Sequence, residues 1–239
     1  MLPRAIKRWI REPAKRLDSA LHSLLSAESD PGLNPLYGDR SIEYAFVIAQ
    51  LLDVDRRKAV LDVGCSGSPL STIVKSLGFE CVHGIDLLPS PVRFDGVQFF
   101  QGDFLRTRAL RDSYGVVILC SSIEHFGLAG RFNSPDVPEG DLQALERARQ
   151  LLEPQGRLIL TVPYGVEKVI WPLHRVYNRQ SKLLQLAFSS LKVIQEEYYR
   201  NDASNVWLRC TEAEASELVP GADNYALGLF AFSKSGSGG

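Results

Sequence analysis

Three aspartates and one Glu–His pair are the residues of this 239-residue chain whose types and positions best suit chemistry. Asp62, Asp86 and Asp103 each fall at or just after the end of a short apolar run with strand-like composition. Glu124 and His125 follow a longer apolar run. In an open α/β sheet, ligands bind beyond the carboxyl ends of the strands. The pattern therefore predicts one site in which carboxylates hold a polar ligand and an imidazole can take a proton.

The stretch 60–69 has the composition of a strand, a tight turn and the start of a helix. It begins apolar and β-branched, and Gly64 and Gly67 allow a close approach that a Cβ would block. Pro69 stands near the start of the amphipathic segment 70–77, where a missing N–H costs nothing. Such a turn is expected to present backbone N–H groups to an anionic or polar ligand.

The residue types in this turn distinguish between kinds of nucleotide site. A phosphate-binding P-loop needs a Gly-Lys-Ser/Thr end, and a dinucleotide fingerprint needs G-x-G-x-x-G, so neither fits. With Asp62 ahead of the first glycine, the stretch resembles motif I of the class I (Rossmann-like) S-adenosylmethionine (SAM) dependent methyltransferases, hydrophobic-D/E-x-G-x-G-x-G. Ser66 and Ser68 replace its second and third glycines. The resemblance implies cofactor contacts from Asp62, Gly64, Cys65, Ser66 and Gly67. The plain alternative is an ordinary glycine-containing turn.

Two further acids occupy positions that the same family uses. Asp86 lies about 20 residues beyond the glycine turn, where an acid can accept hydrogen bonds from both ribose hydroxyls of an adenosine ligand, NAD included. The resemblance adds Leu87 beside it. The step Gly102-Asp103-Phe104 resembles the methyltransferase element that reads adenine, although Asp103 could also cap a helix over 104–111.

The order of these elements predicts the fold. Strands and helices alternate from 59 to 162, the step Glu153-Pro154-Gln155-Gly156 leads into a fifth strand, and a strand pair ends the chain. This resembles the α/β fold of the family: a seven-stranded, mostly parallel sheet with one reversed strand and helices on both faces. The expected methyltransferase domain is 40–232, with a helical insertion at about 165–190 after strand five and a flexible tail at 233–239.

The N-terminal region 1–39 is expected to add a basic amphipathic helix over 4–25 and a lid loop. Pro13 would kink or divide that helix. The helix could pack on its own domain, lie on an anionic membrane or contact another subunit. Tyr37, just before the next helix, is a candidate acceptor-binding lid residue by resemblance, and a plain surface loop is equally consistent.

Composition limits the class of protein. The chain has 45% hydrophobic and 23% charged residues and a formal net charge of -1, which argues against a nucleic-acid partner. Its four cysteines lie far apart, so neither a disulfide framework nor a zinc site is indicated. It contains no apolar run near 18 residues and no signal-peptide pattern, so a cytoplasmic location is expected, with membrane association through 4–25 left open.

The segment after the fourth apolar run is expected beside the reacting methyl group. Cys120 and Ser121 end that run and would contact the cofactor. His125 is the candidate base, because an ordinary imidazole is largely neutral at physiological pH. Glu124 could orient the ring. Alternatively, Glu124 and His125 only support the fold.

No metal is predicted. Small-RNA 2′-O-methyltransferases hold Mg²⁺ with an E-x-x-E-H run and a further His. Here Ser121 stands at the first Glu position, and the remaining candidates Glu124, His125 and His174 suit magnesium poorly because it prefers oxygen ligands.

The acceptor is assigned only by class. Tyr164, His174, Arg175 and Tyr177 are candidate acceptor-binding residues, since aromatic clusters commonly stack on rings and sugars. The favoured activity is O-methylation of a small-molecule or glycan hydroxyl, with S-adenosylhomocysteine as product. An N-methyltransferase, a lipid-linked or quinone-like acceptor, a non-catalytic SAM-fold subunit and a nicotinamide dehydrogenase remain as alternatives. Oligomeric state is not indicated.

Overall fold

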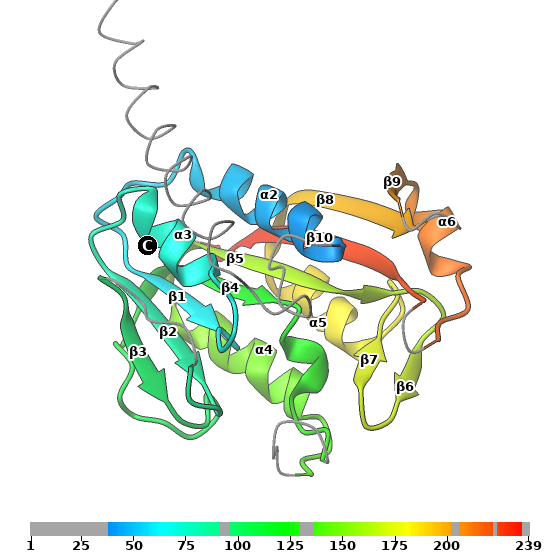
Figure 1. Cartoon of the computed structure of the whole chain (residues 1–239), viewed down its shortest axis with the longest axis horizontal. Helices are drawn as coiled ribbons and strands as arrows, with labels where there is room; N and C mark the ends of the chain where they lie inside the picture. The colour runs from blue at the N-terminus through cyan, green and yellow to red at the C-terminus, as the bar shows by residue number, and fades with distance from the viewer. Residues whose placement is uncertain (1–37, 91–95, 130–135, 202–205, 222–223, 236–239) are drawn as a thin grey trace, which may run out of the picture.

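The computed structural model describes residues 38–90, 96–129, 136–201, 206–221 and 224–235. Its main sheet has eight strands in the order β3-β2-β1-β4-β5-β10-β8-β9, and a two-stranded sheet, β6-β7, lies beside it (Figure 1). The expected helix 4–25 and Tyr37 fall outside the described residues.

The strands of the main sheet are β1 Val60–Val63, β2 Val82–Asp86, β3 Gln98–Gln101, β4 Tyr114–Cys120, β5 Leu152–Tyr164, β8 Lys192–Asn201, β9 Trp207–Cys210 and β10 Ala226–Ser233. The hairpin consists of β6 Lys168–Ile170 and β7 His174–Val176. The helices are α2 Asp39–Leu51, α3 Leu70–Ser76, the short 3₁₀ helix η1 Ile123–His125, α4 Gly140–Leu151, α5 Lys182–Ser190 and α6 Glu212–Ser216.

Strand directions confirm the expected sheet. The first five strands pair in parallel, and β10 runs antiparallel between β5 and β8. The eighth strand is an addition to the prediction: β9 pairs antiparallel with β8 and forms an edge of the sheet. Parallel strands joined by crossover helices place their carboxyl ends together, which is where a site can form.

Helices cover both faces of the sheet (Figure 1). Every residue of β1 and β4 is buried, as expected of central parallel strands. In β4, Val117 and Leu119 pack into a core with α4 and α5, whereas Val116 and Ile118 pack into a core with α2 and α3. The alternation of side chains along a strand thus serves two layers of helices.

The prediction after β3 was wrong, and the one after β5 is confirmed for half of the segment. Residues 104–106 form a turn and 107–111 an irregular segment rather than a helix. The carbonyls of Leu105 and Thr107 accept hydrogen bonds from Arg147 on α4 instead of from a following helical turn. The insertion at 165–190 is helical only in its second half, α5, and its first half is the β6–β7 hairpin. In that hairpin the chain reverses around Pro172, which suits a turn better than a helix.

The short helix α6 is stabilised at its start by hydrogen bonds between neighbouring residues. Thr211 caps α6 by accepting a hydrogen bond from the Glu214 N–H, and the Glu214 carboxylate accepts from the Thr211 N–H, forming a capping box. No helix in the described part of the chain is long and apolar enough to cross a membrane.

Candidate functional site

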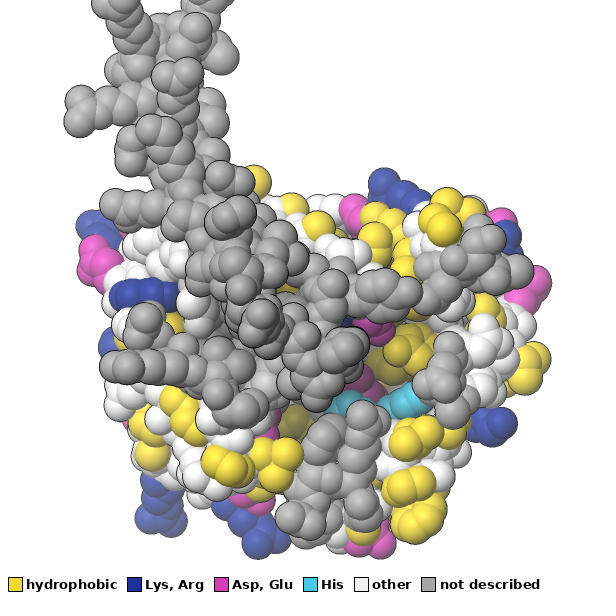
Figure 2. Space-filling model, in the orientation of Figure 1, with side chains coloured by type: hydrophobic (Ala, Val, Ile, Leu, Met, Phe, Trp, Pro, Cys, Tyr) yellow, Lys and Arg dark blue, Asp and Glu magenta, His cyan; other side chains and the backbone are white. Residues whose placement is uncertain are grey.

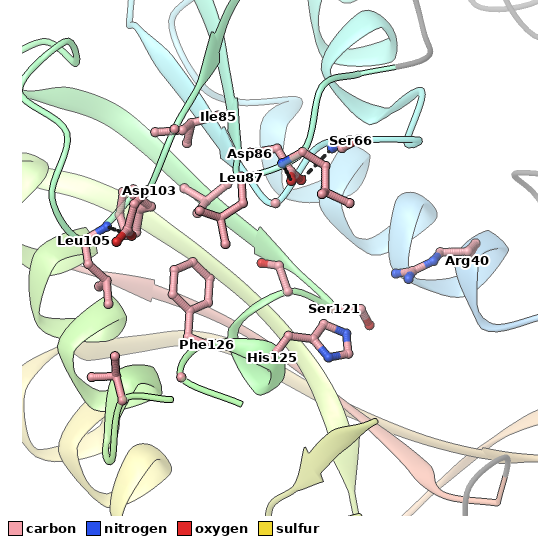
Figure 3. Close-up of a pocket in the computed structure, with 18 residues that line it drawn as sticks. Arg40, Ser66, Ile85, Asp86, Leu87, Asp103, Leu105, Ser121, His125 and Phe126 are labelled. Carbon is pink, nitrogen blue, oxygen red and sulfur yellow. Dashed lines mark hydrogen bonds between the residues drawn. The ribbon is translucent and has the colours of Figure 1, made fainter. Parts of the chain in front are cut away.

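A cavity of about 200 Å³ opens at the carboxyl ends of the parallel strands (Figure 3). The expected cofactor residues that line it are Gly64, Ser66, Asp86, Leu87, Gly102, Asp103, Phe104 and Ser121, and the candidate base His125 lines it too. Figure 2 shows histidine and acidic side chains lying close together near the middle of this face. Among the expected residues alone, the topology therefore brings together positions as far apart as Gly64 and His125, 61 residues away in the sequence.

Asp86 is held in place by backbone N–H groups. As the last residue of β2, it accepts hydrogen bonds from the Ser66 N–H at 2.8 Å and from the Leu88 N–H at 2.9 Å, one at each carboxylate oxygen. Each oxygen keeps a further lone pair toward the cavity that Asp86 lines. This fixed carboxylate can accept hydrogen bonds from two neighbouring hydroxyls, as a ribose would present them.

Asp103 lines the same cavity at the end away from Arg40 and His125, beside apolar side chains (Figure 3). Its carboxylate accepts a hydrogen bond from the Leu105 N–H at 2.8 Å. The Phe104 and Phe126 rings meet edge to face at 5.9 Å, and Leu105 also lines this end. A carboxylate beside an apolar wall suits a flat aromatic base that carries an amino group.

Gly64 allows the turn after β1 to lie against the end of β4. Its φ is +79°, and a Cβ there would lie 2.5 Å from the Cβ of Ser122, so a larger residue does not fit. The Gly64 N–H donates to the Ile85 carbonyl at 2.8 Å, and the Ser66 N–H is used by Asp86. Contrary to expectation, these two N–H groups bind the neighbouring strand β2 rather than facing a ligand.

Four of the expected cofactor residues, Asp62, Cys65, Gly67 and Cys120, do not line the cavity as the described residues form it. Asp62 is 2% exposed and accepts a hydrogen bond from the Ser71 hydroxyl at 2.6 Å. Burial raises the pKa of Asp62 to about 6. Its carboxylate therefore ties β1 to α3 behind the turn. Cys65 and Cys120 are buried thiols.

His125 has one defined tautomer in its neutral form. Its Nδ1 lies 2.8 Å from the Leu173 carbonyl, which can only accept, so Nδ1 carries the hydrogen and Nε2 carries the lone pair. Nε2 lies 3.6 Å from Oε1 of Glu124. The His125 side chain is 21% exposed, and therefore an acceptor in the cavity can reach it.

Glu124 is a buried acid beside this imidazole. Its residue is 2% exposed, and burial raises its pKa to about 8. Its Oε2 has no hydrogen-bond partner among the described residues. While His125 is neutral, Glu124 is mostly protonated near pH 7, and a proton on Nε2 would favour the Glu124 carboxylate. The pair is thus suited to share one proton.

The predicted acceptor residues lie behind the site rather than in the cavity wall. Arg175 on β7 donates to the carbonyls of Phe126 at 2.6 Å and Glu124 at 3.3 Å, and its Nε lies 3.7 Å from Asp141. The Tyr177 hydroxyl donates to Asp141 at 2.9 Å. These bonds hold η1 against α4 and the hairpin, so Arg175 and Tyr177 position the site from outside.

The other two candidates are also buried. Tyr164 is 0% exposed, and its hydroxyl donates to Glu212 at 2.7 Å. His174 is 6% exposed, and its ring meets Tyr225 edge to face at 5.3 Å. Tyr164 and His174 therefore lie in the core and do not line the cavity that the described residues form.

Sequence reasoning missed Arg40 and Glu43, which α2 brings to the cavity. Arg40 lines it, and Glu43 is 0% exposed behind it. Glu43 accepts from the Ser121 and Thr161 hydroxyls, each at 2.5 Å, and from Nη1 of Arg40 at 2.7 Å. One signal existed: Glu43 lies on the helix face of Phe46, Val47 and Gln50, at the spacing of a buried stripe.

The described residues contain no group of three His, Cys, Asp or Glu side chains placed to hold a metal ion. His174 is turned toward Tyr225 rather than joined with Glu124 and His125 in such a group.

The strand order, the reversed β10 and the cavity at the carboxyl ends of the parallel strands define the class: the chain has the fold of the class I, Rossmann-like, SAM-dependent methyltransferases. A family model described as "Caenorhabditis protein of unknown function, DUF268" matches residues 101–219. A search of curated proteins found no match to the chain.

Solved structures of other proteins resemble this chain in fold. The 1,6-didemethyltoxoflavin-N1-methyltransferase of Burkholderia thailandensis, with bound 1,6-didemethyltoxoflavin and S-adenosylhomocysteine, is 15% identical to this chain. Its TM-score is 0.54 over 98% of this chain and 92% of that chain. The N-methyltransferase NodS of Bradyrhizobium japonicum with S-adenosylhomocysteine is 12% identical, with a TM-score of 0.55 over 92% and 98%. A TehB-like methyltransferase of Corynebacterium glutamicum is 17% identical, with a TM-score of 0.52 over 93% and 100%.

Proposed function

We propose that this protein is a SAM-dependent methyltransferase that acts on a hydroxyl of a small molecule or glycan. The observation that carries the proposal is the pair of fixed carboxylates, Asp86 and Asp103, in one cavity at the ends of β2 and β3. Asp86 suits the ribose hydroxyls and Asp103 suits the adenine amino group. Phe104, Leu105 and Phe126 supply the apolar wall that an adenine ring needs.

The remaining residues suit the methyl-transfer end. When bound, SAM would supply a methyl group carried on a sulfonium: as the acceptor oxygen bonds to the methyl carbon, the carbon–sulfur bond breaks and the thioether S-adenosylhomocysteine is the leaving group. In this chain, Nε2 of His125 takes the acceptor hydroxyl proton, because its Nδ1–H is committed to the Leu173 carbonyl. Glu124 lies 3.6 Å from Nε2. In the form of the enzyme that has Glu124 ionised, the pair gains one proton in this step, and the carboxylate stabilises the resulting imidazolium. Arg175 keeps η1 in place through the carbonyls on either side of His125.

N-methylation is the second candidate. It is favoured by the likeness to two N-methyltransferases, one of which has a small molecule, 1,6-didemethyltoxoflavin, bound. An amine that is already neutral needs no strong base, so in that case His125 would orient the acceptor rather than take its proton.

Calorimetry with SAM and S-adenosylhomocysteine tests the cofactor assignment directly. Micromolar binding of both, with no heat from NAD, is the expected result. Absence of binding to either would overturn the proposal. A screen with methyl-labelled SAM against hydroxyl and amine acceptors then separates the activities, and binding without any transfer across the screen would favour a non-catalytic SAM-fold subunit.

A further inference from the structure

The cavity is charged unequally along its length. Among the described residues that line it, the charged ones are Asp86, Asp103 and Arg40. Figure 3 shows Arg40 near Ser121 and His125, at the opposite end from Asp103 and Leu105. The adenosine end is thus acidic, and the transfer end has a single cationic side chain in its described lining.

Arg40 is held by a carboxylate that is itself removed from solvent. Nη1 of Arg40 donates to Glu43 at 2.7 Å, and the side chains of Arg40 and Glu43 are 38% and 0% exposed. The Ser121 and Thr161 hydroxyls donate to the other oxygen of Glu43. Glu43 therefore lies behind the guanidinium, and an anion in the cavity meets the guanidinium first.

Most of the donors of Arg40 are not used by the fold. A guanidinium has five N–H groups in a fixed fork, and its one hydrogen bond to a described residue uses Nη1. A fork of this kind suits a carboxylate or phosphate, which it can bind through two parallel hydrogen bonds. Because Glu43 fixes one edge of the group, its remaining donors are oriented in advance.

The glycine turn does not offer an equivalent anion site. The N–H groups of Gly64 and Ser66 are bound to Ile85 and Asp86, and the Ser68 N–H donates to the Cys65 carbonyl at 3.1 Å. Among the described residues that line the transfer end, Arg40 is therefore the side chain with a permanent positive charge to meet an anionic group.

We infer that Arg40 binds a carboxylate at the transfer end of the cavity, and that Glu43 is the positioning residue that orients it. This inference rests on the proposed function. The carboxylate has two chemical sources: the amino-acid part of the cofactor, or an acid group on the acceptor beside the methylated atom. In both cases the recognition is the same, a guanidinium fork on a carboxylate.

The test is calorimetry of Arg40→Gln with two ligands, S-adenosylhomocysteine and 5′-methylthioadenosine. Both contain adenosine and a thioether, but the second lacks the amino acid. If the cofactor supplies the carboxylate, the variant binds S-adenosylhomocysteine roughly 10- to 100-fold more weakly and 5′-methylthioadenosine within about twofold of wild type. Arg40→Lys is the matched variant, which keeps the charge without the fork and is expected to lose less.

If the acceptor supplies the carboxylate, S-adenosylhomocysteine binding is unchanged. Transfer assays with hydroxybenzoate and hydroxybenzamide, which differ in the acid group, then show an acid preference in wild type that falls at least about tenfold in Arg40→Gln. An unchanged ratio of ligand affinities together with an unchanged acid preference overturns the inference. An equal loss of both adenosine ligands also overturns it, because this indicates that Arg40 only supports the fold.

Glu43→Gln tests whether Glu43 positions Arg40. The measurements are the same two: the affinity ratio of the two adenosine ligands and the acid preference in transfer. It is expected to shift the affinity ratio, or the acid preference, in the direction of Arg40→Gln while leaving binding of 5′-methylthioadenosine unchanged. A loss of both ligands in parallel contradicts that role. If wild type binds neither ligand, the proposed function itself fails and the inference falls with it.

Discussion

The adenosine end and the transfer end of the cavity are built in different ways. At the adenosine end, Asp86 and Asp103 are each fixed by the backbone N–H two residues further along, at Leu88 and Leu105. At the transfer end, contacts join residues far apart in sequence: Glu43 is 78 positions from Ser121, and His125 is 48 from Leu173. Under the proposed function, we expect cofactor recognition to depend mainly on local turns, with the Ser66 N–H, 20 positions from Asp86, as a further contact. We expect transfer chemistry to depend on the packing of α2, η1 and the hairpin.

Burial separates the two ends as well. Asp86 and Asp103 line the cavity, where their carboxylates can contact solvent or a ligand. Glu124 at the transfer end is 2% exposed, with a pKa raised to about 8 by burial. Proton chemistry is therefore expected to be concentrated at the transfer end, and substitutions at the two ends should affect different measurements.

The largest expected effect is on turnover at the transfer end. His125→Ala should lower kcat by about 100- to 10,000-fold, the usual contribution of a general base, and leave the affinity for S-adenosylhomocysteine within about threefold. Single-turnover assays with labelled SAM, together with calorimetry, measure both. His125→Gln, which keeps a polar side chain, is the matched control. Undiminished turnover in either variant would show that Nε2 takes no proton.

The next effect belongs to the adenosine end. Asp86→Ala should weaken binding of S-adenosylhomocysteine about 100-fold or more, or roughly 2.7 kcal/mol, because charged hydrogen bonds to two hydroxyls are lost together with the partner of the Ser66 N–H. Calorimetry measures the change. Asp103→Asn, which keeps an acceptor for the Leu105 N–H, should lose less. Wild-type affinity in Asp86→Ala would place the ribose elsewhere.

The sheet could be predicted because its signals are local. The apolar runs of β1 and β4, the steps after β2 and β3 and the capping box of α6 are all readable over a few residues. The missing helix at 104–111 was not readable, because the Arg147 side chain that binds its carbonyls lies about 40 positions away.

The same distinction applies to the site. Asp86 and Asp103 were expected at the cavity and lie there, since strand ends define their position. Arg40 and Glu43 were missed because a charged pair near the start of a helix is usually solvated, and the spacing of Glu43 with Phe46, Val47 and Gln50 was the only sign of burial. The burial of Tyr164 and Tyr177 was not predictable, because aromatic residues suit a binding pocket and a core equally well and only the packing of β5 and β7 decides.

Glu124, the buried acid at the transfer end, should also make the free energy of unfolding depend on pH. The folded-state pKa of Glu124, about 8, is above its ordinary value of 4.5, so its stabilising contribution is complete below pH 4.5 and is lost as pH rises through 8. Between pH 6 and 8, the free energy of unfolding should fall by at most about 1.4 kcal/mol per pH unit from this group.

Glu124→Gln removes that titration, so urea unfolding across pH 6 to 8 should show a flatter dependence than wild type. Gln keeps the size of the side chain and replaces a group that is mostly uncharged at pH 7. An identical slope in the two proteins would mean that Glu124 is ionised in the folded state throughout this range.

The smallest expected effect tests whether Asp62, which lies behind the glycine turn, affects cofactor binding. Asp62→Asn keeps an oxygen that accepts from the Ser71 hydroxyl, and the Asp62 carboxylate does not line the cavity. Affinity for S-adenosylhomocysteine should therefore stay within about threefold, whereas Asp86→Asn, the same change on the neighbouring strand, should weaken it at least tenfold. The pKa of Asp62, about 6 against an ordinary 3.8, makes its stabilising contribution decline as pH rises from about 4 to 6, and the Asn variant should lack that decline. Equal losses of affinity in the two variants would mean that Asp62 acts on the cofactor through the glycine turn. Binding of the adenosine part would then depend on Asp62 as well as on Asp86 and Asp103.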